Sequence, residues 1–335
     1  MSHKEKSETS SRPGETSGGM MHDKGLPGLR MFLALIITAG VIIGIALGMG
    51  RLENRVLQGQ AGPVPVAVGL VLCQTPDWMP EELGKVIAKG LLPANANYND
   101  PALAEQVHQS AAKNPWVSKV NVISKRMSSD PRIGELVVDA QFRQPIAKVR
   151  TIGDQLVFVD LSGVRLPDEQ VPKYMVIVGD QAGSRKISCF MDKAHAPGDA
   201  QEIHYVEIQI ENDMDGMPPE PGKKWDCAAL LEGLKLVELI SCRVWVNQIK
   251  FIDVRNYNGR INKKESFLRM IAQVEKSSPT EIKFGRFPAA GGDYEISPLR
   301  KMSYLDAYVA DHNGMLAGKN QYLDLRYDEL HVSIN

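Results

Sequence analysis

The chain has 335 residues, with 39 lysine and arginine residues against 40 aspartate and glutamate residues, so its formal net charge at pH 7 is −1. This balance provides no electrostatic footprint for nucleic acid, and no run of like charge indicates an acidic or basic tail. We therefore expect no nucleic-acid partner.

The cysteines are too far apart along the chain to form a C-x-x-C pair, so they indicate neither a zinc site nor a thioredoxin-like motif. We expect them to be buried small hydrophobic side chains, and one disulfide remains an alternative in an oxidising compartment. The cysteines are Cys73, Cys189, Cys227 and Cys242.

Residues 1–30 contain many Ser, Gly, Lys and Glu residues and few aliphatic ones, which predicts a disordered cytoplasmic tail. The apolar residues 31–50 follow, long enough for one transmembrane helix, and residues 51–63 form a juxtamembrane linker. A cleaved signal peptide is the alternative, but its apolar region spans only about 7 to 15 residues. Because a long domain translocates largely regardless of charge, we expect a single-pass inner-membrane protein with its C-terminal domains outside the cytoplasm.

Three glycines of this apolar segment recur at every fourth position: Gly40, Gly44 and Gly48. This spacing lets two membrane helices approach closely, which would support self-association. Glycine is also common in membrane helices in general, so both interpretations stay open.

Two helices are expected in residues 64–149. After a strand-like run at 64–73, Asp77 is predicted to cap the first helix. Asp100-Pro101 is predicted to open the second helix. The apolar positions of the first helix are Leu83, Val86, Ile87 and Leu91, and those of the second are Leu103, Val107 and Ala111.

Two alternating segments follow, joined by a turn at residues 128–132. The first segment places Trp116, Val120 and Val122 on one face, and the second places Leu136, Val138, Ala140 and Phe142 on one face. The predicted order is β-α-α-β-β, a small sheet with two helices on one face. Such a sheet leaves an open edge to which an extended peptide can add.

Residues 150–335 predict a mostly antiparallel β domain of short strands interrupted by two helices, so the fold class is α+β. One helix lies near residues 226–240. The other is expected to begin at Ser297-Pro298, to end at Asn313-Gly314 and to direct Leu299, Met302, Leu305 and Val309 inward. A strand over residues 322–334 closes the domain.

The stretch 168–224 is the least regular part of this domain, and we interpret it as an insertion or an extra hairpin. Within it, Glu211, Asp213 and Asp215 imitate the start of a calcium loop, but Gly222 stands where a bidentate glutamate is needed. The pattern therefore predicts a solvated loop.

Three motifs in sequence order resemble one family. They are Asn114-Pro115-Trp116-Val117, then Arg143-Gln144-Pro145-Ile146-Ala147, and finally Tyr322-Leu323-Asp324-Leu325-Arg326-Tyr327. On these residues the chain resembles FtsQ/DivIB, the bitopic cell-division proteins of bacteria. It departs from the family pattern at Phe142, where glutamate is usual, and at residues 168–224, which have no clear counterpart.

The resemblance implies a POTRA domain at residues 64–149 and an FtsQ/DivIB-type β domain at residues 150–335. It implies a non-catalytic scaffold at the division septum that helps to control septal peptidoglycan synthesis. The implied partners are other bitopic division proteins, FtsB/DivIC-like and FtsL-like. By position, the implied binding surface is Tyr327, Glu329, Leu330 and Ile334. Asp324 and Arg326 have a simpler interpretation, an ion pair within the β domain.

The sequence gives less support to an enzyme or to a protein-export component. The sequence has no G-x-S-x-G, H-E-x-x-H, P-loop or G-x-G-x-x-G motif, so we expect neither an enzyme nor a bound cofactor or metal. The alternative function is a POTRA-containing component of a protein export or outer-membrane assembly system. Such proteins usually end in a long barrel of alternating strands, a pattern that the two helices interrupt here.

Overall fold

The computed structural model describes residues 67–130, 132–151, 154–179, 185–211, 215–287 and 295–333, together with Ile45, Gly48 and Met49. The chain divides into two compact units, Met1–Val64 and Pro65–Asn335. In these described parts no helix combines the length and the apolar character needed to cross a membrane. The predicted tail, the linker and most of the predicted transmembrane segment, including Gly40 and Gly44, lie outside the described residues. Gly48 is helical, and a Cβ built on it would meet no atom within 4 Å.

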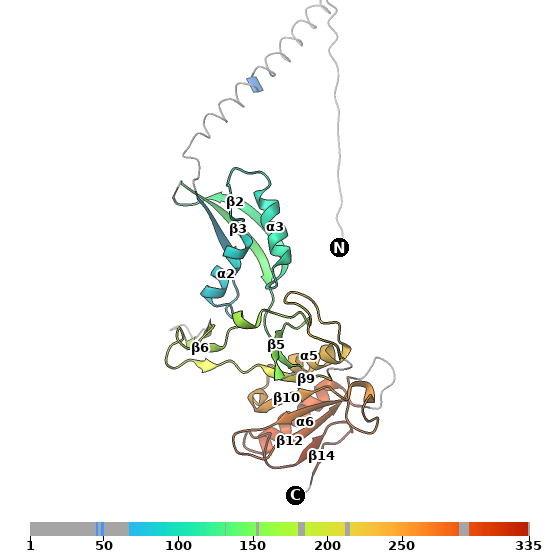
Figure 1. Cartoon of the computed structure of the whole chain (residues 1–335). Coiled ribbons are helices and arrows are strands. Elements are labelled where there is room, and N and C mark those ends of the chain that lie inside the picture. Colours follow the sequence, from blue (N-terminus) through green and yellow to red (C-terminus); the bar gives the residue numbers. More distant parts are fainter. Residues whose placement is uncertain are drawn as a thin grey trace, which may run out of the picture. The chain divides into compact units, whose positions relative to one another are not determined.

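The N-terminal part of the second unit forms a three-stranded sheet with two helices, in the predicted order (Figure 1). The central strand pairs in parallel with the first strand and in antiparallel fashion with the second, giving the order β1-β3-β2. The elements are β1 (Ala67–Cys73), α2 (Glu81–Leu91), α3 (Leu103–Lys113), β2 (Val117–Met127) and β3 (Ile133–Phe142).

Each of these helices buries a stripe of residues spaced four apart, which lie on one helical face. The stripes are Leu83, Ile87 and Leu91 in α2, and Leu103, Val107 and Ala111 in α3, and they share a core with Leu136, Val138 and Ala140 of β3. Val86 was expected on the same face but is 46% exposed, because it precedes Ile87 by one position and is rotated about 100° away from it.

The predicted cap at Asp77 is also wrong. Helix α2 begins after Pro80, which occupies the N-cap position and has no side chain that could cap. A turn from the Pro76 carbonyl to the Met79 amide, with an N–O distance of 2.9 Å, separates Asp77 from the helix. Proline fits at a helix start because no intrahelical bond needs its missing N–H there.

Strand β2 does not keep the predicted alternation. Its register against β3 shifts between Val117 and Lys119 and again between Val120 and Val122. A bulge adds one residue to a strand, so the side chains beyond it change face. Val122 is therefore 57% exposed, and Ile123 packs against the core in its place. Trp116 is buried as expected.

Gly134 of β3 is a position where an added methyl group should be costly. A Cβ there would lie 2.1 Å from Cδ2 of Tyr98, whose carbonyl oxygen is held by the Lys125 ammonium at 2.8 Å. We expect Gly134→Ala to lower the free energy of unfolding by about 1–3 kcal/mol, measured by urea denaturation. Gly69→Ala in the neighbouring strand is the control, because its Cβ would make ordinary contacts at 3.8 Å. Equal effects of the two variants would contradict this explanation.

The second sheet has eight strands in the order β14-β13-β12-β11-β10-β9-β4-β5. Helices α5 (Ala228–Ile240) and α6 (Pro298–Asp311) contribute to the same hydrophobic core as its strands. The strands are β4 (Ala147–Arg150), β5 (Leu156–Val159), β9 (Val206–Gln209), β10 (Ile249–Asp253), β11 (Leu268–Ala272), β12 (Thr280–Gly285), β13 (Tyr322–Asp324) and β14 (His331–Val332). Short 3-10 helices cover Asp168–Gln170, Val246–Gln248 and Tyr257–Gly259.

This sheet is mixed, although antiparallel pairs are the majority in the domain, as predicted. Four of its seven strand pairs are antiparallel, while β4–β9, β9–β10 and β12–β13 are parallel. Parallel neighbours need a crossover connection, which α5 supplies between β9 and β10 and α6 supplies between β12 and β13. The described parts of the chain combine helices with separate sheets and are α+β.

The extra hairpin predicted within residues 168–224 is present. Strands β6 (Tyr174–Gly179), β7 (Arg185–Phe190) and β8 (Gln201–Glu202) form a separate sheet in the order β7-β6-β8. The loop that follows β9 is less solvated than predicted, because the Asp215 side chain is only 5% exposed. It accepts two hydrogen bonds from Arg260, at 2.7 and 2.6 Å. Asp213 lies outside the described residues.

Helix α6 begins at the predicted site, where the Ser297 hydroxyl caps the Arg300 amide at 3.4 Å and Pro298 occupies the first turn. Asn313 and Gly314 end it with positive φ angles of 56° and 82°. Met302, Leu305 and Val309 are buried as predicted, but Leu299 is 68% exposed and Lys301 and Tyr308 are buried with the core residues instead. Of the cysteines, Cys189 and Cys227 are buried, Cys73 is half-buried, Cys242 is exposed and all four are free thiols.

The eight-stranded sheet contains an internal repeat that was not predicted. The segments β9–α5–β10–β11 and β12–α6–β13–β14 each consist of a strand, a helix, a parallel strand and an antiparallel strand. The third element of each ends in the same D-x-R motif, Asp253 with Arg255 and Asp324 with Arg326. In both, the aspartate accepts from the arginine backbone N–H, at 3.0 and 3.2 Å, and from its guanidinium, at 2.9 and 2.6 Å.

The ion pair of Asp253 should make stability depend on pH. Burial alone would raise the pKa of this carboxyl group, but hydrogen bonds from Arg255 and the Arg269 charge outweigh it and lower the pKa below 3.8. Because the folded pKa lies below the unfolded one, the stabilisation is complete above pH 3.8 and is lost as the pH falls through the folded pKa.

We expect Asp253→Asn to lower the free energy of unfolding at pH 7 by about 2–3 kcal/mol, since charged hydrogen bonds are lost in a buried site. Urea denaturation at pH 7 and at pH 3 should show the difference from the wild type shrinking at the lower pH. Asp154→Asn, whose carboxylate pairs with Arg150 while 85% exposed, is the control with an expected effect below about 1 kcal/mol. A difference for Asp253→Asn that does not change with pH would contradict this account.

Candidate partner-binding edge

The two ends of the eight-stranded sheet differ. At the β5 end, Val159 forms a bridge with Arg165, and the Leu166 amide donates to the Phe158 carbonyl at 2.8 Å, so a following segment covers this edge. At the other end, no further strand of the described chain pairs with β14 (Figure 1). An uncovered edge strand offers N–H and C=O groups that can pair with another chain.

The register of the last hairpin shows which groups are free. The Ser333 amide donates to the Tyr322 carbonyl at 3.1 Å, and Leu323 lies opposite Val332. In an antiparallel ladder, hydrogen-bonded and non-hydrogen-bonded pairs alternate. The N–H and C=O of Val332 therefore point away from β13, toward the open side of β14.

The short strand β14 is held in place by Ser333. The Ser333 hydroxyl oxygen accepts hydrogen bonds from the amides of Gln321 and Tyr322, at 2.7 and 3.1 Å, and its carbonyl accepts from the Asn320 side chain at 3.1 Å. These bonds add to the two-residue ladder that holds β14 beside β13.

The turn between β13 and β14 rests on α6. The Tyr304 hydroxyl donates to the Asp328 carbonyl, and the Arg300 guanidinium lies 3.8 Å from the Asp328 carboxylate. A helix of the core thus supports the loop next to the open edge.

Tyr327 is the exposed aromatic side chain of this turn, with 51% of its surface accessible. Its ring centroid lies 5.0 Å from the His331 ring and 5.6 Å from the Arg326 guanidinium carbon. Arg326 is itself fixed by Asp324 at 2.6 Å. Burial would raise the pKa of Asp324, but the hydrogen bonds and charge of Arg326 lower it overall, so the pair stays ionised at neutral pH. The predicted pairing of Asp324 with Arg326 is confirmed.

The predicted binding residues occupy different environments. Tyr327 and Glu329 are exposed, whereas Leu330 is half-buried and packs against the core. Ile334 lies outside the described residues. His331 and Val332 carry the open edge but were not predicted, because the turn splits the expected strand 322–334 into β13 and β14. The repeated D-x-R motif was a signal for this turn, since β10 also ends at that motif.

In the described parts of the chain, no three His, Cys, Asp or Glu side chains gather as metal ligands would. No protein-family model matches the chain, and no curated protein matches it either. The geometry of the β14 edge is that of a surface for strand addition.

Proposed function

We propose that the chain is a non-catalytic, membrane-anchored scaffold of the bacterial cell-division machinery, of the FtsQ/DivIB type. The observation that carries the proposal is the open β14 edge beside exposed Tyr327, at one end of a sheet whose other end is covered. The β-α-α-β-β order of residues 67–142 and the sequence motifs support the same assignment.

The proposed partners are small bitopic proteins of the FtsB/DivIC and FtsL type, one of which adds an extended segment to β14. The internal repeat supports a direction for that segment. Strand β14 corresponds to β11, which pairs in antiparallel fashion with β12, whereas β14 has no such neighbour among the described strands. The added strand would therefore run antiparallel to β14.

The remaining parts of the proposal follow from the sequence. The apolar segment 31–50 would fix the protein in the inner membrane at the division septum, and Gly40, Gly44 and Gly48 would allow self-association there. The POTRA module at residues 64–149 would recruit other division proteins through an edge of its sheet.

We expect full-length wild-type protein, affinity-purified from its native membranes, to recover small bitopic coiled-coil proteins. Tyr327→Ala should reduce that recovery by about tenfold or more, because an exposed aromatic side chain can act as a hot spot worth about 2 kcal/mol. Val244→Ala is the control, since it also removes an exposed apolar side chain, one that is 92% exposed in the same unit. Equal recovery by both variants, or recovery of outer-membrane and secretion components instead, would overturn the proposal. The second result would favour the export alternative.

A further inference from the structure

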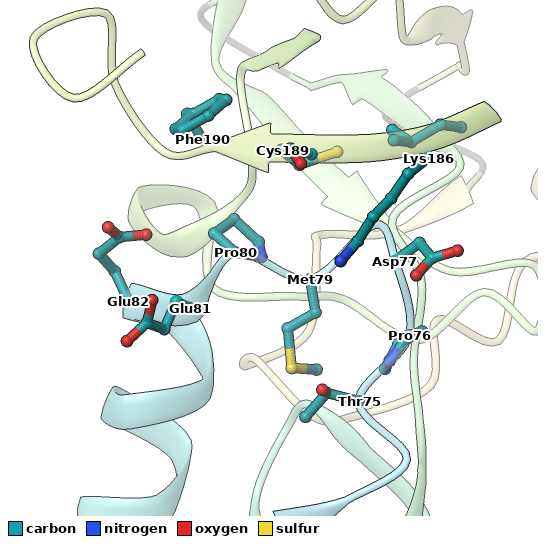
Figure 2. A pocket seen from close by; sticks show the side chains of 12 residues that line it. Thr75, Pro76, Asp77, Met79, Pro80, Glu81, Glu82, Lys186, Cys189 and Phe190 are labelled. Atoms are coloured by element: carbon teal, nitrogen blue, oxygen red, sulfur yellow. The ribbon is translucent and has the colours of Figure 1, made fainter. Parts of the chain in front are cut away.

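A hollow of about 410 Å³ lies between the separate β7-β6-β8 sheet and the segment that leads into α2 (Figure 2). Its two sides are formed by residues within 75–82 and by residues 186–190. Figure 2 shows the side chains of Asp77 and Lys186 on these two sides. The hollow is separate from the β14 edge, and strand β7 of the extra hairpin forms one of its two sides.

The strand edge of β7 borders this hollow. In the described sheet β7 pairs only with β6, so one of its edges has no partner there. Five consecutive residues, 186–190, line the hollow. Side chains of consecutive strand residues point to opposite faces of the sheet, so one face alone would contribute only every second residue to the lining. Because residues 186–190 all line the hollow, the edge of β7 faces it. Alternate N–H and C=O groups of an edge strand point outward and can bond an added strand.

The charges around the hollow favour a cationic side chain. Three carboxylates, those of Asp77, Glu81 and Glu82, face one ammonium group, that of Lys186. Glu81 forms an ion pair with Lys85 at 2.7 Å, whereas Asp77 and Glu82 have no ion-pair partner within the described part of the chain. A lysine or arginine of a bound segment would therefore be attracted here by unpaired carboxylates.

The apolar surface beside the edge suits an extended segment. Ile187 of β7 is 40% exposed, and its partner across the sheet, Ile177 of β6, is 54% exposed. Met79 and Cys189 form a buried apolar part of the lining, each with 8% of its surface accessible. A strand added to β7 would cover Ile187 with one face and reach the carboxylates with the other.

We propose that the β7 edge and this hollow bind an extended segment of a partner protein by strand addition, with a lysine or arginine of that segment directed to Glu82. The inference goes beyond the proposed function and does not depend on it. Its strand edge belongs to residues 168–224, the part of the chain without a counterpart in the FtsQ/DivIB pattern, and its carboxylates belong to residues 75–82. An experiment that disproves the division role would leave the β7 binding site unaffected. An experiment that disproves the β7 binding site would likewise leave the division role unaffected.

The test uses the full-length protein in lipid nanodiscs and a nine-residue acetylated peptide of alternating threonine and valine with lysine at its centre. We expect the peptide to slow hydrogen exchange of the β7 amides. A matched peptide with glutamate at the centre should bind at least about tenfold more weakly, a difference of about 1.4 kcal/mol. The lysine peptide with alternate N-methylated amides should not bind, because strand addition needs those donors.

Two charge reversals complete the test. Glu82→Lys should weaken binding of the lysine peptide by about tenfold. Glu105→Lys should leave binding unchanged, because Glu105 is also an exposed first-turn glutamate but belongs to α3, outside the hollow. Absence of protection at β7 with millimolar peptide would overturn the proposal. Protection confined to β14, equal binding of the lysine and glutamate peptides, or equal effects of the two reversals would also overturn it.

Discussion

Val332→Pro is expected to abolish recovery of the small bitopic partners from native membranes, a loss of about a hundredfold or more. The N–H of Val332 points away from β13, so it is free to donate to an added strand. Proline removes that donor and places its ring where the partner backbone must approach, and a hundredfold loss corresponds to about 2.7 kcal/mol. Quantitative mass spectrometry of the co-purified proteins measures the effect.

The fold should tolerate this change. The bond from the Ser333 amide to the Tyr322 carbonyl does not involve Val332, and His331, the residue before the new proline, already lies in a strand as that position requires. Val332→Thr is the matched control, because it keeps the donor and the β-branched shape. Melting curves of both variants should match the wild type. Unchanged recovery with Val332→Pro would rule out strand addition at β14 as the mode of binding.

Local periodicity accounts for the parts of the fold that could be predicted. The spacing of Leu103, Val107 and Ala111, and the alternation of Leu136, Val138 and Ala140, each specify one buried face without reference to distant residues. The same local capping chemistry predicted the helix start at Ser297 and Pro298 correctly, but the cap that it predicted at Asp77 was wrong, because Pro80 occupies the N-cap position of α2.

Features set by distant neighbours could not be predicted. Val122 changed face because β2 carries bulges against β3, and a bulge leaves no mark in the alternation of a single strand. The parallel pairs of the second sheet depend on crossovers through α5 and α6, and strands of three to six residues carry no signal for their neighbours. For the same reason, the extra hairpin within residues 168–224 was predicted without the bounds or the pairing of its strands.

The position of the candidate edge near the end of the chain was predicted, but the turn and the two short strands that form it were not. Tyr327 and Glu329 are exposed as a binding surface requires, whereas Leu330 serves the core, so the substitution Leu330→Asp would test folding rather than binding. The backbone N–H of Val332 is the donor for an added strand. Its outward direction is set by the register of the hairpin, which no pattern of side chains in the sequence specifies. The burial of Lys301 was also not predicted, because lysine side chains are usually exposed.

Lys301→Met is expected to lower the free energy of unfolding by about 3–5 kcal/mol, the usual cost of removing one partner of a buried ion pair. The Lys301 side chain is fully buried, and its ammonium donates to the carbonyls of Phe284 and Arg286, at 2.7 and 3.0 Å, and to the Glu295 carboxylate at 2.6 Å. Burial lowers the pKa of Lys301 although Glu295 opposes that shift.

The same contacts connect α6 to the end of β12, and α6 carries Tyr304 and Arg300, which support the turn next to β14. Urea denaturation of Lys301→Met, Glu295→Gln and the double variant measures the coupling, and the double variant should be more stable than the sum of the single losses predicts. Lys263→Met, at an exposed lysine, should change stability by less than about 0.5 kcal/mol. A similarly small loss for Lys301→Met would mean that α6 is fixed by its apolar residues alone, and the β14 edge would then need no buried charge for its support.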